Sequence, residues 1–344
     1  MNDSPDEPLV PDRPRPVRIV DVAEAAGVSA ITVSRTLKSP EKVSRKTRDR
    51  VAEAIDRLGY VVNPIASWLR CGQSSIVTVF VASLQNPHHA ARVQGIADAF
   101  EGSPYQLMFT QTGFSGGVDR GVFETLRLLR PAGAILTSST VEHDALVREM
   151  STLDAPLVQI GDIASPHGLR VQVSSREAGR LMGDHLAAIG RRAIVFCGHT
   201  LGHGARRLDG LREGLAAHGQ SLRLVLPIEG TQNIGDGSWA LGEILETVPE
   251  CDAIFFGSDL MAMGALIEAG IRGVDVPGRI AIAGYGDLDF ACNLDPPLTT
   301  IRLSDYDSGR IAGQMLLARL QTGRPSEEVR IQQVSLQIRQ STAP

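Results

Sequence analysis

The chain has 344 residues, of which 43% are hydrophobic and 21% are charged, proportions typical of a soluble globular protein with two or three domains. This composition excludes a mainly disordered chain, a collagen-like repeat and a small disulfide scaffold. No apolar run approaches the roughly 20 residues that a membrane-spanning helix needs. The four cysteines are scattered without a Cys-x-x-Cys pair, which favours reduced thiols in the cytoplasm.

The charge is distributed unevenly along the chain. The total is −5, yet residues 13–73 carry 12 Lys and Arg against 6 Asp and Glu, whereas residues 1–12 contain 4 acidic residues and no Lys or Arg. The Pro-rich stretch 1–17 lacks the apolar segment of a secretory signal, and it predicts a disordered tail. A basic block ahead of an acidic body indicates a separate anion-binding domain, although a solvated helical surface would carry the same charges.

The basic block contains the pattern of a helix-turn-helix. Within residues 19–38, Ala23 is followed four residues later by Gly27 and six residues after that by Val33. A small residue lets two helices approach closely, a glycine permits the positive φ of a tight turn, and an apolar residue closes the small core. Ser29 is placed to cap the second helix. The spacing alone is a weak signal, because any helical hairpin can produce it.

Two further helices are expected in the basic block. An amphipathic pattern predicts one from about Ser44 to Leu58. A shorter helix begins near Pro64, since proline suits the first turn, and ends at Gly72. Ala66 and Leu69 would share one face of this shorter helix.

From residue 74 onward, short apolar runs alternate with helical patterns. This alternation predicts parallel sheets covered by helices on both faces, and the length of the segment suggests two lobes. The expected strands are Ile76–Ala82, Gln106–Thr110, Gly133–Thr137, Leu157–Gly161, Val171–Ser174, Ala193–Gly198, Leu222–Ile228, Ala253–Gly257, Ile280–Gly284 and Thr299–Leu303.

Three local patterns bear on chemistry, and none predicts an active site. Gly202-x-Gly204 follows a strand and opens a helix, but the third glycine of a dinucleotide fingerprint is missing. Cys197, His199 and His203 lie close in sequence, but no fourth zinc ligand is nearby. The histidine pair at 88–89 suits a ligand contact or a helix start better than a catalytic dyad. We therefore expect neither enzyme activity nor a metal ion or cofactor.

Together, the motifs of the basic block and the body resemble those of the LacI/GalR family of bacterial repressors, and most closely its gluconate-repressor branch. The resemblance runs from about Arg18 to Thr342. It is carried by Asp21-Val22-Ala23, Ala26-Gly27-Val28-Ser29, Thr32-Val33-Ser34-Arg35, Val43-Ser44, Leu58-Gly59-Tyr60, Asn63, Gly95-Ile96, Gly264, Ala283-Gly284-Tyr285 and Pro296-Pro297-Leu298-Thr299-Thr300-Ile301.

The resemblance implies an α/β protein with an N-terminal all-α helix-turn-helix head, a hinge helix and a two-lobed core like that of periplasmic sugar-binding proteins. After the tail, the expected bounds are 18–62 for the head, 63–74 for the hinge helix and linker, and 75–344 for the core. Lobe 1 is expected at about 75–174 plus 304–330, and lobe 2 at about 175–303 plus 331–344.

The resemblance also places the second helix in the major groove of operator DNA. Ala30, Ile31 and Arg35 then occupy base-reading positions, and the Arg35 fork suits guanine O6 and N7. Leu69, with Ala66 one turn earlier, matches the residue that enters the minor groove. Phosphate contacts are expected from Thr32, Ser34, Ser44, Thr47 and Asn63.

A small effector is expected in the cleft between the lobes. Arg207 matches the family's effector-binding arginine, whose fork suits sugar hydroxyls or a carboxylate, although a surface salt bridge would explain it as well. Gly286 stands where neutral-sugar members carry an aspartate, and its lack of charge favours an anionic ligand. We therefore expect a sugar acid such as gluconate. The other candidate effector residues are Asn86, His88, Asp162, Ser258, Asp259 and Asp287.

The implied function is a cytoplasmic repressor that binds a pseudo-palindromic operator as a homodimer and has no membrane partner. Effector and operator would change each other's affinity by the same factor. Two other classes of protein would share the body. A sugar-binding transport protein would need an export signal and no basic head, and an α/β enzyme should show a poised nucleophile or a cofactor loop.

Overall fold

A computed structural model describes residue 15 and residues 17–61, 74–112, 119–137, 144–162, 168–230, 232–323 and 328–343. Its contacts divide the chain into two compact units, Met1–Cys71 and Gly72–Pro344, which we call the head and the core. Most of the expected tail lies outside the described residues. So does the expected hinge helix, with Asn63, Ala66 and Leu69. No helix in the described ranges is long and apolar enough to cross a membrane.

Local signals in the sequence explain where the helices of the head begin and end. Gly27 follows the first helix with a φ of 60°, a conformation that glycine adopts without strain. The Ser29 side chain accepts a hydrogen bond from the backbone N–H of Thr32 and so caps the second helix, as predicted. Ser44 caps the third helix in the same way through the N–H of Thr47. The helices are α1 (Ile19–Ala26), α2 (Ala30–Lys38) and α3 (Arg45–Leu58), with a 3-10 turn, η1 (Pro40–Lys42), before the last.

The core of the head is small and made of short aliphatic side chains. One arginine contributes to its stability from the surface. The Arg50 guanidinium donates hydrogen bonds to the carbonyl oxygens of Ala26 and Gly27, which satisfies carbonyls that the end of α1 leaves unpaired. The buried side chains are Val22, Ala23, Ala26, Val33, Val51 and Ala54.

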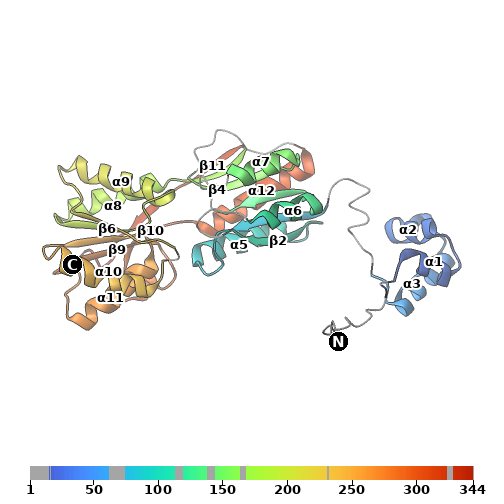
Figure 1. Cartoon of the computed structure of the whole chain (residues 1–344), viewed down its shortest axis with the longest axis horizontal. Coiled ribbons are helices and arrows are strands. Elements are labelled where there is room, and N and C mark those ends of the chain that lie inside the picture. The colour runs from blue at the N-terminus through green and yellow to red at the C-terminus, as the bar shows by residue number, and fades with distance from the viewer. Residues whose placement is uncertain are drawn as a thin grey trace, which may run out of the picture. The chain divides into compact units, whose positions relative to one another are not determined.

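The core contains two sheets (Figure 1). Their strands follow the same order. The first sheet has the order β2-β1-β3-β4-β5-β11, and all its pairings are parallel. Its strands are β1 (Ile76–Val81), β2 (Gln106–Gln111), β3 (Gly133–Leu136), β4 (Leu157–Gly161), β5 (Leu169–Val173) and β11 (Val329–Gln332). Its helices are α5 (Pro87–Phe100), α6 (Arg120–Leu129), α7 (Asp144–Thr152) and α12 (Asp305–Thr322). We call this sheet and its helices lobe 1.

Lobe 2 repeats this plan with the order β7-β6-β8-β9-β10-β12, in which only β12 is antiparallel. Its strands are β6 (Ile194–Gly198), β7 (Leu224–Pro227), β8 (Ala253–Phe256), β9 (Ala281–Gly286), β10 (Thr299–Arg302) and β12 (Ser335–Gln337). Its helices are α8 (Ser175–Ala188), α9 (His203–Ala217), α10 (Ile234–Thr247) and α11 (Asp259–Arg272), with a 3-10 turn, η3 (Ala291–Asn293). Each sheet is covered by apolar clusters, which confirms the predicted α/β architecture.

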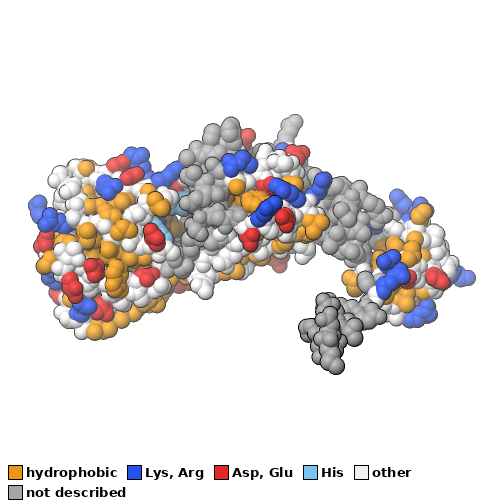
Figure 2. All heavy atoms as spheres, viewed as in Figure 1, with side chains coloured by type: hydrophobic (Ala, Val, Ile, Leu, Met, Phe, Trp, Pro, Cys, Tyr) orange, Lys and Arg blue, Asp and Glu red, His pale blue; other side chains and the backbone are white. Residues whose placement is uncertain are grey.

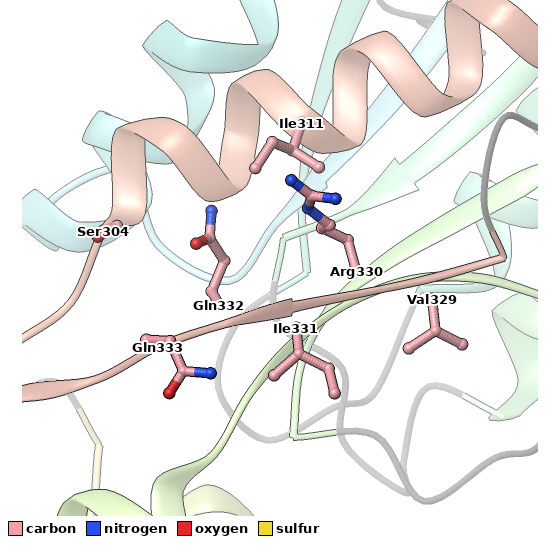
Figure 3. Close-up of a pocket in the computed structure, with 7 residues that line it drawn as sticks. All are labelled: Ser304, Ile311, Val329, Arg330, Ile331, Gln332 and Gln333. Carbon is pink, nitrogen blue, oxygen red and sulfur yellow. The ribbon is translucent and has the colours of Figure 1, made fainter.

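The chain passes between the lobes three times, after β5, after β10 and after β11. The last passage follows Gln332, so the boundary expected at residue 330 cuts through β11 and lies two residues too early. An open hollow of about 530 Å³ lies against this edge strand. Arg330 and Gln332 project from one face of β11 towards Ile311 of α12, and Ile331 projects from the other (Figure 3). Sequence patterning missed β11 and β12, because neither of these short strands is a continuous apolar run.

Candidate functional site

The exposed face of α2 carries the residues that the sequence predicts to read bases. Ala30 and Ser34 are four residues apart, as are Ile31 and Arg35, so the four side chains share one side of the helix. The opposite side presents Val33 to the core of the head, with no exposed area. Ile31 is 71% exposed, so its side chain is accessible to a partner. Lys and Arg side chains are spread over the visible face of the head (Figure 2).

Three of the residues that we expect to contact phosphates, Thr32, Ser44 and Thr47, lie at the starts of helices. The hydroxyls of Ser29 and Thr32 lie 2.9 Å apart at the start of α2. Those of Ser44 and Thr47 are separated by the same distance at the start of α3. Exposed helix starts with free backbone N–H groups are good positions for phosphate oxygens. The structure therefore places Thr32 at the start of α2, leaves Ser34 on the side of α2 that carries Ile31 and Arg35, and brings Ser44 and Thr47 together at the start of α3.

In each lobe, candidate effector residues follow the carboxyl ends of the strands at the centre of the sheet. Asn86 comes after β1, and its side chain caps α5 by accepting from the N–H of His88. Ser258 comes after β8, and its side chain caps α11 by accepting from the N–H of Leu260. β1 and β6 are the strands at which the order reverses in their sheets. Such switch points are where open α/β sheets bind ligands.

Arg207 is a buried cation at the switch point of lobe 2. Its side chain comes from α9, donates from Nη1 to the Gly257 carbonyl at 2.7 Å, and stacks with its Cζ 3.4 Å from the centre of the Tyr285 ring. No Asp or Glu in the described ranges forms an ion pair with it, and its Nε has no hydrogen-bond partner there. Burial lowers the pKa of the guanidinium, which nevertheless stays protonated at neutral pH. An isolated buried cation of this kind is suited to bind an anion.

The amide of Gln232 lies beside this arginine. A side chain on Gly257 would contact both Arg207 Nη1 and Gln232 Nε2, each at 3.3 Å. Gln232 Nε2 is buried and has no acceptor among the residues that the structure describes. The N–H donors of Arg207 and Gln232 therefore lie close together, past the carboxyl ends of β6 and β8.

The two aspartates of lobe 2 have different surroundings. Asp259 is fully buried and accepts hydrogen bonds from Thr300 Oγ1 at 2.6 Å and from the N–H of Leu288 at 2.8 Å. Burial raises the pKa of Asp259 despite these bonds.

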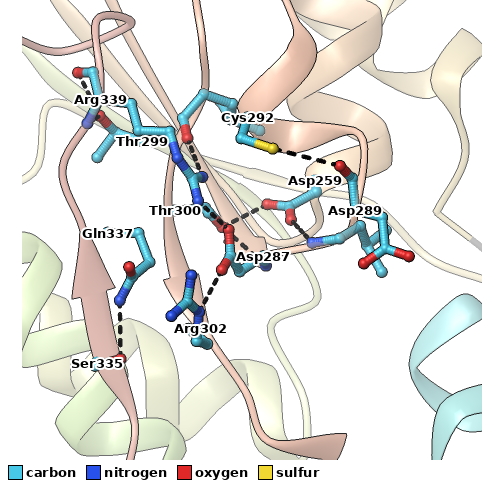
Figure 4. A network of polar contacts seen from close by, with 12 residues as sticks. Asp259, Asp287, Asp289, Cys292, Thr299, Thr300, Arg302, Ser335, Gln337 and Arg339 are labelled. Atoms are coloured by element: carbon cyan, nitrogen blue, oxygen red, sulfur yellow. Dashed lines mark hydrogen bonds and ion pairs between the residues drawn. The ribbon is translucent and has the colours of Figure 1, made fainter.

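Asp287 instead joins the two segments by which the chain leaves and re-enters lobe 2. Its carboxylate pairs with Arg302 at 2.5 Å and with Arg339 at 2.6 Å (Figure 4). Both carboxylate oxygens of Asp287 are thus already bonded to guanidinium groups, which gives this residue a second, structural role beside its predicted effector contact.

Lobe 1 contributes a second polar group, formed by His88, Arg92 and Asp305. His88 Nδ1 lies 2.7 Å from Asp305 Oδ2, and Arg92 Nε lies 2.8 Å from Asp305 Oδ1. Arg92 Nη1 also donates to the Thr137 carbonyl at 2.6 Å. Burial acts to raise the pKa of Asp305, but Arg92 and His88 outweigh it and lower this pKa to about 2. Asp305 is therefore ionised and fixes the orientation of the His88 ring.

An ion pair also joins the two lobes. Asp162, which follows β4 of lobe 1, accepts from Arg206 of α9 at 2.8 Å and from the N–H of Ser175, the first residue of α8, at 3.1 Å. Histidine side chains are visible where the lobes meet (Figure 2).

Two histidines at this junction, His89 and His203, remain neutral near pH 7 because their pKa values are lowered. Burial, followed by Arg92, lowers the pKa of His89 to about 3. Burial and the nearby arginines lower the pKa of His203 to about 4. Arg92 and Arg206 have carboxylate partners, whereas Arg207 has none among the residues that the structure describes, so its positive charge is uncompensated there.

Several residues of this site escaped the sequence analysis. Arg92 lies one helical turn after His88, and this spacing was the only local signal that pointed to it. Asp305, Arg206 and Gln232 gave no such signal. Among the described residues, no three His, Cys, Asp or Glu side chains gather as metal ligands. Burial raises the pKa of the Cys197 thiol to about 12, so this thiol is protonated.

Comparison with known proteins identifies both units. The model described as "Bacterial regulatory proteins, lacI family" matches residues 18–63, and the model described as "Periplasmic binding protein-like domain" matches residues 183–342. The HTH-type transcriptional regulator GntR of Pseudomonas aeruginosa is 32% identical over 303 residues, which cover 87% of this chain and 88% of the relative.

Solved structures agree with this relationship. A LacI-family transcriptional regulator from Silicibacter pomeroyi has a TM-score of 0.86 and 28% identity, covering 95% of this chain and 99% of its own. The lac repressor dimer bound to operator and the anti-inducer ONPF has a TM-score of 0.80 and 25% identity, with the same coverage. The expected resemblance is confirmed. The chain belongs to the LacI family of bacterial regulatory proteins and is a DNA-binding transcriptional regulator, not an enzyme.

Proposed function

We propose that this regulator is a cytoplasmic repressor that binds a pseudo-palindromic operator as a homodimer. A small sugar-like effector, a sugar acid such as gluconate, would bind between the lobes and control operator affinity. The observation that carries the effector assignment is the buried Arg207 guanidinium without a carboxylate partner. The observation that carries the operator assignment is the exposed face of α2 with Ile31 and Arg35.

On DNA, α2 would lie in the major groove. Arg35 would donate two hydrogen bonds to a guanine, while Ala30 and Ile31 would contact a thymine methyl group or select by shape. Thr32, Ser34, Ser44 and Thr47 would bind phosphates and set the register. In the segment 63–74, proposed as a hinge helix, Asn63 would contact a phosphate, and Leu69 with Ala66 would enter the minor groove.

A homodimer is supported by apolar side chains left exposed on lobe 2. Ile267 and Ile271 are one turn apart on α11 and are 49% and 75% exposed. Trp239 and Ile234 of α10 are 54% and 39% exposed. Large apolar side chains exposed on neighbouring helices are typical of protein interfaces. The related lac repressor, which binds its operator as a dimer, supports the same assembly.

An Arg35→Ala variant tests the reading helix. We expect it to lower operator affinity by about 5- to 150-fold, because one bidentate arginine–guanine contact contributes about 1–3 kcal/mol. The measurement is a gel shift on genomic fragments, followed by titration of the palindrome that the wild type selects. Arg57→Ala, at the exposed end of α3, is the matched control and should bind like the wild type. If Arg35→Ala retains wild-type affinity for this palindrome, α2 does not read the operator in this way.

Calorimetric titration of the full chain tests the effector class. Gluconate, 6-phosphogluconate, glucose and galactose are added separately, with and without operator. We expect an acid to bind more tightly than both neutral sugars, because its carboxylate would pair with Arg207. Tighter binding of glucose or galactose would exclude the sugar-acid assignment. The operator arm gives the sign of control, because an inducer weakens operator binding and a corepressor strengthens it.

A further inference from the structure

The positive charge of the head is concentrated in one segment. Residues 29–48, which form α2, η1 and the start of α3, carry six Lys and Arg and one acidic residue. We call them the cationic segment. The rest of the described head, residues 17–28 and 49–61, carries three Arg and five Asp and Glu. Five of the six cationic side chains are exposed, namely Arg35, Lys38, Lys42, Arg45 and Lys46.

Few charges within the head offset those of the cationic segment. Glu41 is its one acidic residue. Every ion pair that the structure describes joins two residues of the core. A cluster of like charges repels itself and attracts any anionic chain that comes near, whether DNA or protein.

An acidic stretch of the same chain precedes this head. Residues 1–12, which we call the acidic stretch, contain four Asp and Glu and no Lys or Arg. They lie outside the described residues, so the argument from them uses only their sequence. The acidic residues are Asp3, Asp6, Glu7 and Asp12. Their charge is opposite to that of the cationic segment and similar in size.

The acidic stretch is long enough to reach the cationic segment. Proline stands at every third position from Pro5 to Pro14, and proline-rich chain in extended conformations spans about 3.1 Å per residue. The chain from Asp12 to the start of α1 can therefore cover about 20 Å, and the chain from Asp3 about 50 Å. α3, by comparison, is about 21 Å long. A tether this short gives a local concentration of about millimolar, so even a weak contact is populated.

We propose that the acidic stretch binds the cationic segment of its own head and competes with DNA for it. DNA binding then requires the stretch to be displaced, so only the fraction of heads with a free segment is ready to bind. Because the competition takes place in the free protein, operator and unrelated duplexes should lose affinity by the same factor. This inference goes beyond the proposed function and takes from it only the contact between residues 29–48 and DNA.

Zero-length crosslinking of the full chain tests the contact directly. All three lysines of the chain, Lys38, Lys42 and Lys46, lie in the cationic segment. A carbodiimide, which joins a carboxyl group to an adjacent amine as an amide, therefore reports on this segment. We expect mass spectrometry to find peptides that join residues 1–12 to these lysines. The peptides should disappear when a duplex saturates the heads, and also in about 1 M salt, where the Debye length is about 3 Å.

Neutralising the acidic stretch tests its effect on DNA binding. We expect the Kd values for the operator and for an unrelated duplex both to fall at least about threefold at low salt, because the intramolecular competitor is lost. The gain should shrink as salt is raised, since screening already releases the stretch in the wild type. The same variant should give no crosslinked peptide from residues 1–12. It carries Asp3→Asn, Asp6→Asn, Glu7→Gln and Asp12→Asn.

The matched control makes the same change of net charge on the core. Its four acidic side chains are exposed, at 68%, 60%, 42% and 51%, and lie outside the head. We expect this variant to bind both duplexes like the wild type and to keep the crosslinks. In the same order, its substitutions are Glu124→Gln, Asp209→Asn, Glu213→Gln and Glu250→Gln.

Three outcomes would overturn the inference. The first is the absence of crosslinks between residues 1–12 and the lysines, or their persistence on heads saturated with DNA. The second is a neutralised stretch that leaves both Kd values unchanged. The third is an equal gain in the core variant, which would assign the effect to net charge. The crosslinks are measured without operator, so they decide the contact even if the Arg35→Ala result rejects α2 as the reading helix.

Discussion

Gly210→Ala is expected to destabilise the core by about 3 kcal/mol or more, a value at the upper end for an overpacked site. The added Cβ would lie 1.8 Å from the carbonyl oxygen of Arg176, which is backbone and cannot rotate away. The reverse contact is equally close, since a Cβ on Gly179 would lie 1.9 Å from the carbonyl oxygen of Arg207. α8 and α9 therefore pack backbone against backbone and must separate to admit one methyl group.

The control for this prediction is a helical glycine in open space. Gly270 lies in α11, and a Cβ added there would meet no heavy atom within 4 Å. Gly270→Ala should stabilise the protein by about 0.5–1 kcal/mol, because alanine loses less backbone entropy on folding. Urea unfolding of both variants measures the two effects, which have opposite signs. A similar change in the two midpoints would contradict the close packing of α8 and α9.

Arg207→Met is expected to weaken sugar-acid binding by at least about 30-fold, since truncating one member of a buried, hydrogen-bonded charge pair costs about 2–5 kcal/mol. The loss should be smaller for a neutral sugar, which has no charge to pair. Without ligand, the variant should be at least as stable as the wild type, because it removes a buried cation that lacks a carboxylate partner in the described part of the chain. Stability and binding would thus change in opposite directions.

Calorimetry with gluconate and glucose and urea unfolding without ligand measure these two effects. Arg212→Met, on the exposed side of the same helix, is the matched control and should change neither by much. Arg207→Lys keeps the charge but loses the planar fork, and we expect an affinity between those of the wild type and the methionine variant. If Arg207→Met binds gluconate like the wild type, the acid does not pair with this residue.

The fold could be predicted from the sequence where its signals were local and repeated. The helix starts at Ser29 and Ser44 and the turn at Gly27 depend on residues a few positions away, so a short stretch of sequence contains the cause. The strands of both sheets were predicted to within about two residues, because buried parallel strands are continuous apolar runs. The edge strands β11 and β12 lacked that signal, and their partners are distant in sequence.

The candidate site was predicted less completely. Arg207 was selected through the family resemblance, but only the fold shows that it is buried without a carboxylate partner. Asp287 was predicted as an effector contact, and the structure shows its carboxylate paired with Arg302 and Arg339. That prediction remains to be tested by ligand binding.

The sequence by itself determined the type of protein, because a helix-turn-helix and an alternating α/β body are recognised from residues that lie about two to seven positions apart. Only the tertiary structure decided how the effector site is assembled. His88 and Asp305 are 217 positions apart, and they meet because the chain returns to lobe 1 after building most of lobe 2. No local pattern encodes such a meeting, since it depends on where whole sheets and helices pack.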